Sequence, residues 1–264
     1  MRRLTATAAL IAVLCAGCPP IERRTNGTGG TVTPANLKEG QAEMLRGEYE
    51  KAERTFRAAR ESGGARAAYW HGRALAALGH YKEAREALDA AAAAMSEADP
   101  QRLDALLWAA DCAYWYADWK DAAARYQMLL GGHAGALPRT RVMLRLSRSL
   151  MRSGRWDSAR AVCGRLLRTA PTAEVTEAAR AGLLFCEMRR YVIQAAAFSK
   201  KSAAEKMAEA LRSQGLDARI HTWRTPERTV HQVWIGEFSD YRDAVRELSR
   251  VRARERLQDA VVRP

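Results

Sequence analysis

A chain of 264 residues is long enough for about two domains, and its 48% hydrophobic and 28% charged content is ordinary for folded globular protein. This composition excludes a chain that is disordered throughout. The formal net charge of +13 favours an acidic partner, but no run of five or six like charges occurs. The charge therefore gives little support for nucleic-acid binding.

The first eighteen residues, MRRLTATAALIAVLCAGC, differ from the rest of the chain. Two arginines precede an apolar stretch of 14 residues from Leu4 to Gly17, which ends in small residues before Cys18. A membrane-spanning helix needs about 20 apolar residues, so this stretch is too short to be one. The pattern predicts a secretory signal peptide over residues 1–17.

The end of this segment, LCAGC, resembles the lipobox of bacterial lipoproteins. The resemblance implies that Cys18 carries the lipid and becomes the mature N-terminus, with the protein anchored to a membrane and facing the periplasm. Pro19, in place of Asp, favours the outer over the inner membrane. Cys15 stands where lipoboxes usually have Leu, and a plain signal peptide with an incidental cysteine is the alternative.

Residues 18–36 are the predicted lipidated cysteine followed by the stretch PPIERRTNGTGGTVTPAN. Proline, glycine, threonine and asparagine dominate this stretch, and little of it is apolar enough to be buried. Such a composition predicts a flexible tether between the membrane and the folded part of the chain.

Residues 37–190 repeat a short pattern four times, as GEYEKA, GHYKEA, ADWKDA and GRWDSA. Each copy has a small residue, an aromatic residue two positions later and an alanine three positions after that. This order predicts two helices joined by a tight turn, with the aromatic ring wedged between them and the alanine at their close approach. Gly40 and Gly72, each seven residues before a turn glycine, predict two further close approaches.

The pattern resembles the tetratricopeptide repeat, although its copies are 32, 38 and 37 residues apart rather than the family's roughly 34. The third copy has Ala110 and Ala117 where the family has glycine. The resemblance implies an all-α helical-repeat solenoid, closed by a capping helix from Thr172 to Arg190, that binds a protein or peptide partner. No residue in the repeats identifies that partner.

After Arg190 the periodicity changes to that of a strand followed by an amphipathic helix, twice over. The pattern predicts an α+β domain over residues 191–264 with the order βαββαβ, a four-stranded antiparallel sheet and both helices on one face. The predicted strands are Tyr191–Phe198, Asp217–Trp223, Val230–Gly236 and Asp259–Arg263, and the predicted helices are Ser202–Gln214 and Tyr241–Leu257.

Two stretches of this domain, YVIQAAAFSKKSAAEKMAEALRSQGLDARI and VHQVWIGEFSDYRDAVREL, resemble the SPOR domain. The resemblance covers essentially all of residues 191–264. It implies binding to bacterial peptidoglycan, specifically to glycan strands stripped of their stem peptides, which occur at division septa.

Alternation along the strands indicates which side chains face away from the helices. Ile193, Ala195, Val233 and Ile235 are expected to face the helices, which leaves the opposite face open. We expect that face to bind glycan, because indole rings stack on the C–H faces of sugars, and amides and guanidinium groups bond to their hydroxyl and acetamido groups. The expected binding residues are Gln194, Arg219, His221, Trp223, Gln232 and Trp234.

Two positions depart from the SPOR pattern. Ala196 and Ala197 replace a Gly-Ser pair, and Gln232 stands where an arginine often precedes the valine of the third strand. Arg219 or Arg224 is a candidate to supply the missing guanidinium, and weak or altered glycan binding is the alternative. RNA-binding RRM domains share this layout, but their Gly-aromatic signature is absent, and export from the cytoplasm argues against nucleic acid.

The residue patterns of enzymes and metal sites are missing from the sequence. No G-x-S-x-G, H-E-x-x-H, P-loop or G-x-G-x-x-G motif occurs, the five histidines are scattered, and the cysteine spacings fit no zinc motif. We therefore predict no enzyme activity, no cofactor and no metal. Cys112, Cys163 and Cys186 are expected to be buried on helices, with a disulfide between two of them as the alternative.

Together these features predict a non-catalytic cell-envelope lipoprotein that binds peptidoglycan and recruits a protein partner through its repeats, in cell division or wall remodelling. One alternative is an adaptor for secretion, pilus or outer-membrane assembly, in which the SPOR domain only anchors the protein to the wall. Another is an accessory protein that presents glycan to a hydrolase or synthase.

Overall fold

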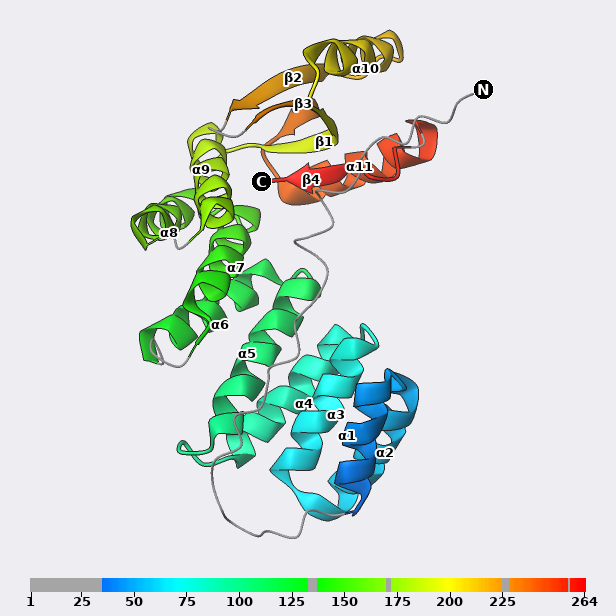
Figure 1. Cartoon of the computed structure of the whole chain (residues 1–264), viewed down its shortest axis with the longest axis vertical. Helices are drawn as coiled ribbons and strands as arrows, with labels where there is room; N and C mark the ends of the chain where they lie inside the picture. The colour runs from blue at the N-terminus through cyan, green and yellow to red at the C-terminus, as the bar shows by residue number, and fades with distance from the viewer. Residues whose placement is uncertain (1–34, 133–136, 170–171, 225–227, 256) are drawn as a thin grey trace. The chain divides into compact units, whose positions relative to one another are not determined.

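The computed structural model describes residues 35–132, 137–169, 172–224, 228–255 and 257–264. The predicted signal peptide, the predicted lipidation site Cys18 and the predicted tether up to residue 34 lie outside the described residues. Helices fill the described chain up to Met188, and a sheet with two further helices follows (Figure 1).

Nine helices, counted over the described residues, make up the first part: α1 Ala35–Arg46, α2 Tyr49–Gly63, α3 Ala65–Ala77, α4 Tyr81–Ala94, α5 Pro100–Trp115, α6 Trp119–Gly132, α7 Arg139–Arg152, α8 Trp156–Thr169 and α9 Ala173–Met188. Each helix packs against the next along the chain (Figure 1). The four sequence motifs lie at the turns α1–α2, α3–α4, α5–α6 and α7–α8, and α9 packs on both α7 and α8. The predicted helical-repeat fold is confirmed.

The turn residue of each motif adopts a left-handed backbone conformation. Gly79 has a φ of 82°, and the N–H of His80 donates to the carbonyl of Leu75 at 2.9 Å. The third motif has Ala117 at this place with a φ of 64°, and the N–H of Asp118 makes the equivalent bond at 3.0 Å. A left-handed alanine costs roughly 1–2 kcal/mol, so the packed helices impose this turn on a residue that disfavours it.

Gly40 and Gly72 lie where the predicted close approaches occur. A Cβ atom at Gly72 would stand 2.6 Å from Cγ of Leu88 and 3.2 Å from the carbonyl oxygen of Ala84, both on the next helix. A Cβ atom at Gly40 would stand 2.5 Å from the ring of Phe56. Each glycine therefore leaves room for the large side chain that its motif places in the core, which confirms the prediction.

Replacing Gly72 by alanine is expected to lower the free energy of unfolding by about 1–3 kcal/mol, because the added methyl group overlaps Leu88 and the α4 backbone. Gly164, inside α8, is the matched control, since a Cβ atom there would meet only the end of Arg168 at 3.7 Å. Gly164→Ala is expected to raise the free energy of unfolding by about 0.5–1 kcal/mol. Urea unfolding of both variants provides the measurement, and equal effects of the two substitutions would show that the α3–α4 contact is loose.

A buried carboxylate on α5 links three helices. Asp111 is 1% exposed, accepts a hydrogen bond from the hydroxyl of Tyr126 at 2.6 Å and forms an ion pair with Arg145. Arg141 lies 3.7 Å from its second oxygen. Burial, followed by the charge of Asp111, raises the pKa of Tyr126 well above its ordinary value, so this hydroxyl stays a donor.

The second part is the predicted four-stranded antiparallel sheet, and its strands lie in the order β2-β3-β1-β4. Both helices pack on one face of the sheet, to which Ala204, Ala208 and Leu211 of the first and Ala244 and Val251 of the second contribute buried side chains. The elements are β1 Tyr191–Phe198, α10 Lys201–Ser213, β2 Ala218–Arg224, β3 Thr229–Phe238, α11 Tyr241–Glu255 and β4 Val261–Arg263.

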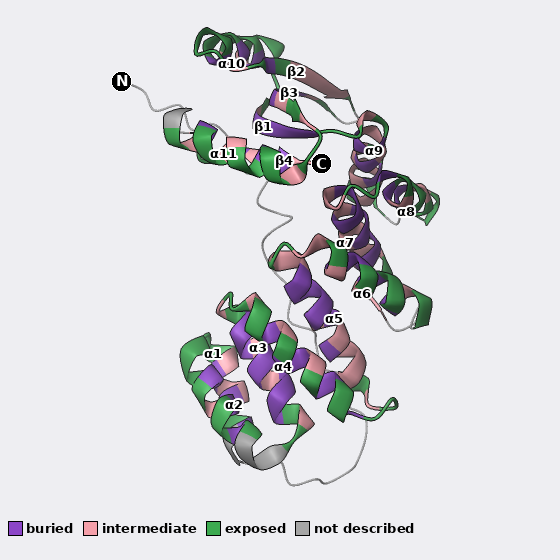
Figure 2. Ribbon diagram, turned by 180° about the vertical axis from the view of Figure 1, so that it is seen from behind, coloured by how far each residue is buried: buried purple, intermediate pink, exposed green. Residues whose placement is uncertain are grey.

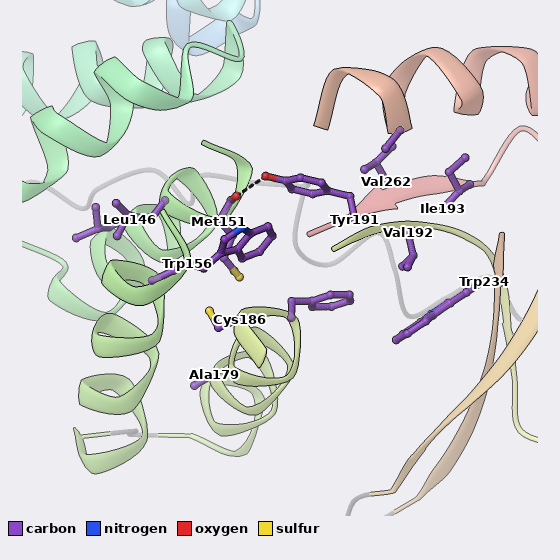
Figure 3. Close-up of a cluster of buried hydrophobic side chains, with 14 of the residues drawn as sticks. Leu146, Met151, Trp156, Ala179, Cys186, Tyr191, Val192, Ile193, Trp234 and Val262 are labelled. Atoms are coloured by element: carbon purple, nitrogen blue, oxygen red, sulfur yellow. Dashed lines mark hydrogen bonds between the residues drawn. The ribbon is translucent and has the colours of Figure 1, made fainter. Parts of the chain in front are cut away.

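The hydrophobic core of the last repeats continues into the sheet (Figures 2 and 3). Tyr191, the first residue of β1, donates its hydroxyl hydrogen to the carbonyl of Met151 on α7 at 2.7 Å. Its ring centroid lies 5.1 Å from that of Trp156 on α8. The change of periodicity after Arg190 is therefore also a point where the two parts share buried side chains.

Candidate functional site

The face of the sheet opposite α10 and α11, which we call the outer face, carries all six of the predicted binding residues. β1 pairs with β3 so that Gln194 stands opposite Trp234. β2 pairs with β3 so that Arg219 stands opposite Trp234 and His221 opposite Gln232. Trp223 lies two residues beyond His221, with its ring centroid 6.4 Å from the imidazole.

Figure 3 shows side chains on both faces of the sheet. Val192 and Trp234 point to one side of the sheet, whereas Ile193 and Val262 point to the other, toward α11. A register shift between Gln194 and Ala196 places Ala196 opposite Val233 and Ala197 opposite Gln232. Of the two alanines that replace the usual Gly-Ser pair, Ala197 is therefore the one on the outer face, where it is exposed.

The prediction that the outer face is open is wrong for two of the six residues. Gln194 is 3% exposed and Trp234 is 8% exposed. The ring of Phe185, on α9, stacks on Trp234 with ring centroids 5.7 Å apart. The imidazole of His221 also stacks on Trp234, with ring centroids 4.2 Å apart and an interplanar angle of 9°. Strand alternation gives the side of the sheet on which a residue lies, but a segment distant in the sequence decides whether that side is covered.

Two side-chain hydrogen bonds hold the planar groups of the outer face. The indole N–H of Trp234 donates to Oε1 of Gln232 at 3.0 Å. Nε of Arg263, on β4, donates to Oε1 of Gln194 at 3.0 Å. The amides are thus held in fixed orientations by an indole and a guanidinium.

Arg263 and Phe185 are contacts of this face that the sequence interpretation missed. For Arg263 a signal was available, because it ends the last predicted strand and alternation places it on the same side as Val261. For Phe185 there was none, since the spacing within α9 says nothing about which strand the ring meets.

The charge of Arg219 is balanced by neighbouring carboxylates. Its guanidinium bonds to Asp217 at 3.1 Å and to Glu237 at 2.9 Å. Burial holds the pKa of His221 below its ordinary value, so the imidazole that stacks on Trp234 is neutral at neutral pH. The outer face therefore offers mostly uncharged rings and amides, with Arg263 beside Gln194.

Within the described ranges, no group of three or more His, Cys, Asp or Glu side chains is arranged to hold a metal ion. No helix in the same ranges is long and apolar enough to cross a membrane. Cys112, Cys163 and Cys186 are buried free thiols on α5, α8 and α9.

Comparison with protein families agrees with both resemblances drawn from the residues. The SPOR domain family matches residues 187–263, and the tetratricopeptide repeat family matches residues 104–133 and 141–173. A SPOR domain implies peptidoglycan binding, and tetratricopeptide repeats imply binding of a protein partner. Both are non-catalytic binding domains.

Several solved structures are similar to this chain. MamA from AMB-1 is 16% identical, with 58% of this chain and 80% of MamA covered and a TM-score of 0.49. YrrB, described as a tetratricopeptide repeat protein with an unusual peptide-binding site, is 18% identical over 68% of this chain and 85% of its own, with a TM-score of 0.48. A tetratricopeptide repeat protein from Parabacteroides merdae is 13% identical, with 67% of this chain and 63% of that protein covered and a TM-score of 0.45.

At these identities and TM-scores the similarities carry no information on ligand or activity. No curated protein sequence matches the chain.

Proposed function

We propose, from the premise that residues 187–263 are a SPOR domain preceded by tetratricopeptide repeats, that this protein binds peptidoglycan glycan strands stripped of their stem peptides and recruits a protein partner to them. The SPOR domain docks on the wall through the outer face of its sheet, and the repeats hold the partner. The protein acts without catalysis, in cell division or wall remodelling.

The observation that supports this proposal is the gathering of planar groups on the outer face. His221, Trp223 and Gln232 are half-exposed there, around the indole of Trp234. Rings stack on the C–H faces of sugars, and amides bond to hydroxyl and acetamido groups. The neutral imidazole suits an uncharged sugar ring, because it does not have to lose water from a charge when it binds.

The cellular setting of the proposal comes from the N-terminal sequence. A lipid on Cys18 anchors the protein to a membrane, with the outer membrane favoured, and the folded part faces the periplasm. In that compartment the glycan strands and the outer face of the sheet can meet.

The burial of Gln194 and Trp234 favours a second role as the alternative. With two of the six predicted residues covered, the outer face has less surface for glycan, and the SPOR domain then serves only to anchor the protein to the wall. The repeats would carry the main function, as an adaptor in secretion, pilus or outer-membrane assembly.

A sedimentation experiment tests the glycan proposal. The unlipidated chain, residues 19–264, is pelleted with intact cell-wall sacculi and with sacculi that an amidase has stripped of stem peptides. We expect binding to the stripped sacculi, and about tenfold weaker binding for Trp223→Ala, because that half-exposed indole offers a stacking surface.

Tyr116→Ala is the matched control, since Tyr116 is a 52% exposed aromatic residue that ends α5 and is not part of the sheet. This variant is expected to bind like the wild type. If the wild-type chain pelleted with neither preparation, glycan binding would be ruled out; equal losses in the two variants would rule out the outer face as the site.

A further inference from the structure

Helix α7 carries a row of positive charges along one side. Its sequence, RTRVMLRLSRSLMR, is rich in arginine and contains no aspartate or glutamate. Arg141, Arg145, Arg148 and Arg152 recur at intervals of four, three and four residues, a spacing that places them one above another on a helix. All four side chains are partly exposed, and we call them the α7 arginine row.

The fold neutralises only part of this charge. Within the described ranges, the ion pairs of the α7 arginine row are those with Asp111 on α5, which pairs with Arg145 and lies 3.7 Å from Arg141. The guanidinium of Arg152 lies instead over the ring of Trp119, 4.5 Å from its centroid. Four guanidiniums against one carboxylate leave a net excess of positive charge at this surface.

Contacts between guanidiniums and indoles continue this surface onto the neighbouring repeats. Arg145 lies 5.1 Å from the ring centroid of Trp115 on α5, and Arg73 on α3 lies 4.1 Å from that of Trp108, also on α5. The helices α3, α5 and α7 each begin one repeat, and stacked repeats present an extended surface for binding. The rings hold the guanidiniums in place, so less side-chain freedom is lost when a ligand binds.

The charge and dimensions of the α7 arginine row fit an extended acidic peptide. From Arg141 to Arg152 the helix rises by about 16 Å, at ~1.5 Å per residue. About five residues of an extended chain cover the same length, at ~3.3 Å per residue. Carboxylates on alternate residues of that chain are then about 6.6 Å apart, near the roughly 4.5–6 Å between successive arginines. Each guanidinium can form charge-assisted hydrogen bonds to a carboxylate.

Other occupants fit this surface less well. Single-stranded nucleic acid needs free rings on which bases can stack, whereas Trp108 and Trp119 already lie under the guanidiniums of Arg73 and Arg152. A second copy of the chain brings a net charge of +13. The predicted tether is also basic, with Arg23 and Arg24 against Glu22. Like charges repel both of these from the row, so an acidic partner is favoured.

We propose that the α7 arginine row binds an extended acidic segment of the partner protein. This assignment rests on the recruitment of a partner by the repeats, proposed above, and names the chemistry of that partner. Arg141 and Arg148 contact its carboxylates, and Arg152 adds its charge from among the rings. Arg145 stays with Asp111 and fixes the row in place.

Fluorescence anisotropy at low ionic strength tests the assignment on the unlipidated chain, residues 19–264. The probe is a fluorescein-labelled peptide in which glutamate and serine alternate, and its partner probe has glutamine in place of every glutamate. We expect the wild type to bind the glutamate peptide at least about tenfold more tightly than the glutamine peptide. Arg148→Gln is expected to weaken binding of the glutamate peptide about fivefold, because one partly exposed ion pair is lost.

Arg139→Gln is the matched control, with the same change of charge on the same helix. Arg139 is exposed and lies two residues before Arg141, which places it on the opposite side of α7. This variant is expected to bind the glutamate peptide like the wild type. Arg148→Lys, which keeps the charge without the planar fork, is expected to fall between wild type and Arg148→Gln.

Three outcomes would overturn the assignment. One is equal affinity of the wild type for the two peptides, and another is an equal loss in Arg148→Gln and Arg139→Gln. The third is tighter binding of a single-stranded oligothymidylate of the same charge, lost in Arg148→Gln, which would make the row a nucleic-acid site. If Arg148→Gln does not fold, Arg148→Lys and the two peptides on the wild type decide the matter.

The glycan proposal is tested separately, because sedimentation with stripped sacculi depends on the sheet and not on α7. Failure of peptide binding alone therefore leaves glycan binding standing. A chain that binds the glutamate peptide but pellets with neither preparation of sacculi keeps the role of the α7 arginine row and overturns the glycan proposal.

Discussion

Replacing Asp111 by alanine is expected to lower the free energy of unfolding by about 3–5 kcal/mol, the cost of leaving a buried charge without its partner. The carboxylate is 1% exposed and is shared by Arg145 and the hydroxyl of Tyr126, which come from α7 and α6. Its removal leaves a guanidinium and a hydroxyl in the core of the third repeat. Urea unfolding followed by circular dichroism measures the effect.

Asp157→Ala is the control for this prediction, since it breaks an aspartate–arginine pair that is exposed to solvent rather than buried. Asp157 pairs with Arg189 at 2.6 Å, but its side chain is 78% exposed. Water solvates the remaining guanidinium of Arg189 once Asp157 is removed, so we expect a loss of about 0–1 kcal/mol. Comparable losses in the two variants would mean that Asp111 is reached by solvent and does not link the helices.

Phe185→Ala is expected to lower the free energy of unfolding by about 3–5 kcal/mol, the usual cost of deleting a buried phenyl ring. Phe185 is 7% exposed and stacks on Trp234. Its removal opens a cavity where the last repeat helix meets the sheet and uncovers the indole. Urea unfolding gives the change in stability, and acrylamide quenching of tryptophan fluorescence is expected to increase as Trp234 becomes accessible.

Phe185→Leu separates loss of volume from loss of the ring. Leucine refills most of the space and keeps Trp234 covered, so a cost of about 1 kcal/mol and unchanged quenching are expected. A Phe185→Ala variant as stable and as poorly quenched as Phe185→Leu would contradict the contact between α9 and the sheet.

The helical repeats could be predicted from the sequence because their determinants are close together in the chain. Gly72 faces Leu88 sixteen residues later, across a single turn, and the motif places both residues. The same reasoning fails for Asp111. No short motif connects Asp111 with its partners, because Tyr126 and Arg145 lie on other helices.

For the candidate site, the side of the sheet could be predicted from the sequence, but the exposure of its residues could not. Strand alternation identified the face that carries Gln194, Trp234 and the other four residues, because successive side chains of a strand project to opposite sides of the sheet whatever the rest of the chain does. It did not predict which of them would be covered. The ring that covers Trp234 comes from α9, which alternation along β3 does not describe.

By itself, then, the sequence determined the elements, their order, the repeat family, the SPOR domain and the side of the sheet on which each residue lies. All of these follow from spacings of a few residues and from short motifs. Only the tertiary structure decided that Phe185 and His221 both stack on Trp234, and that Arg263 bonds to Gln194 across 69 residues of chain. Exposure and pairing of this kind depend on which distant segments pack together, and no local period encodes that.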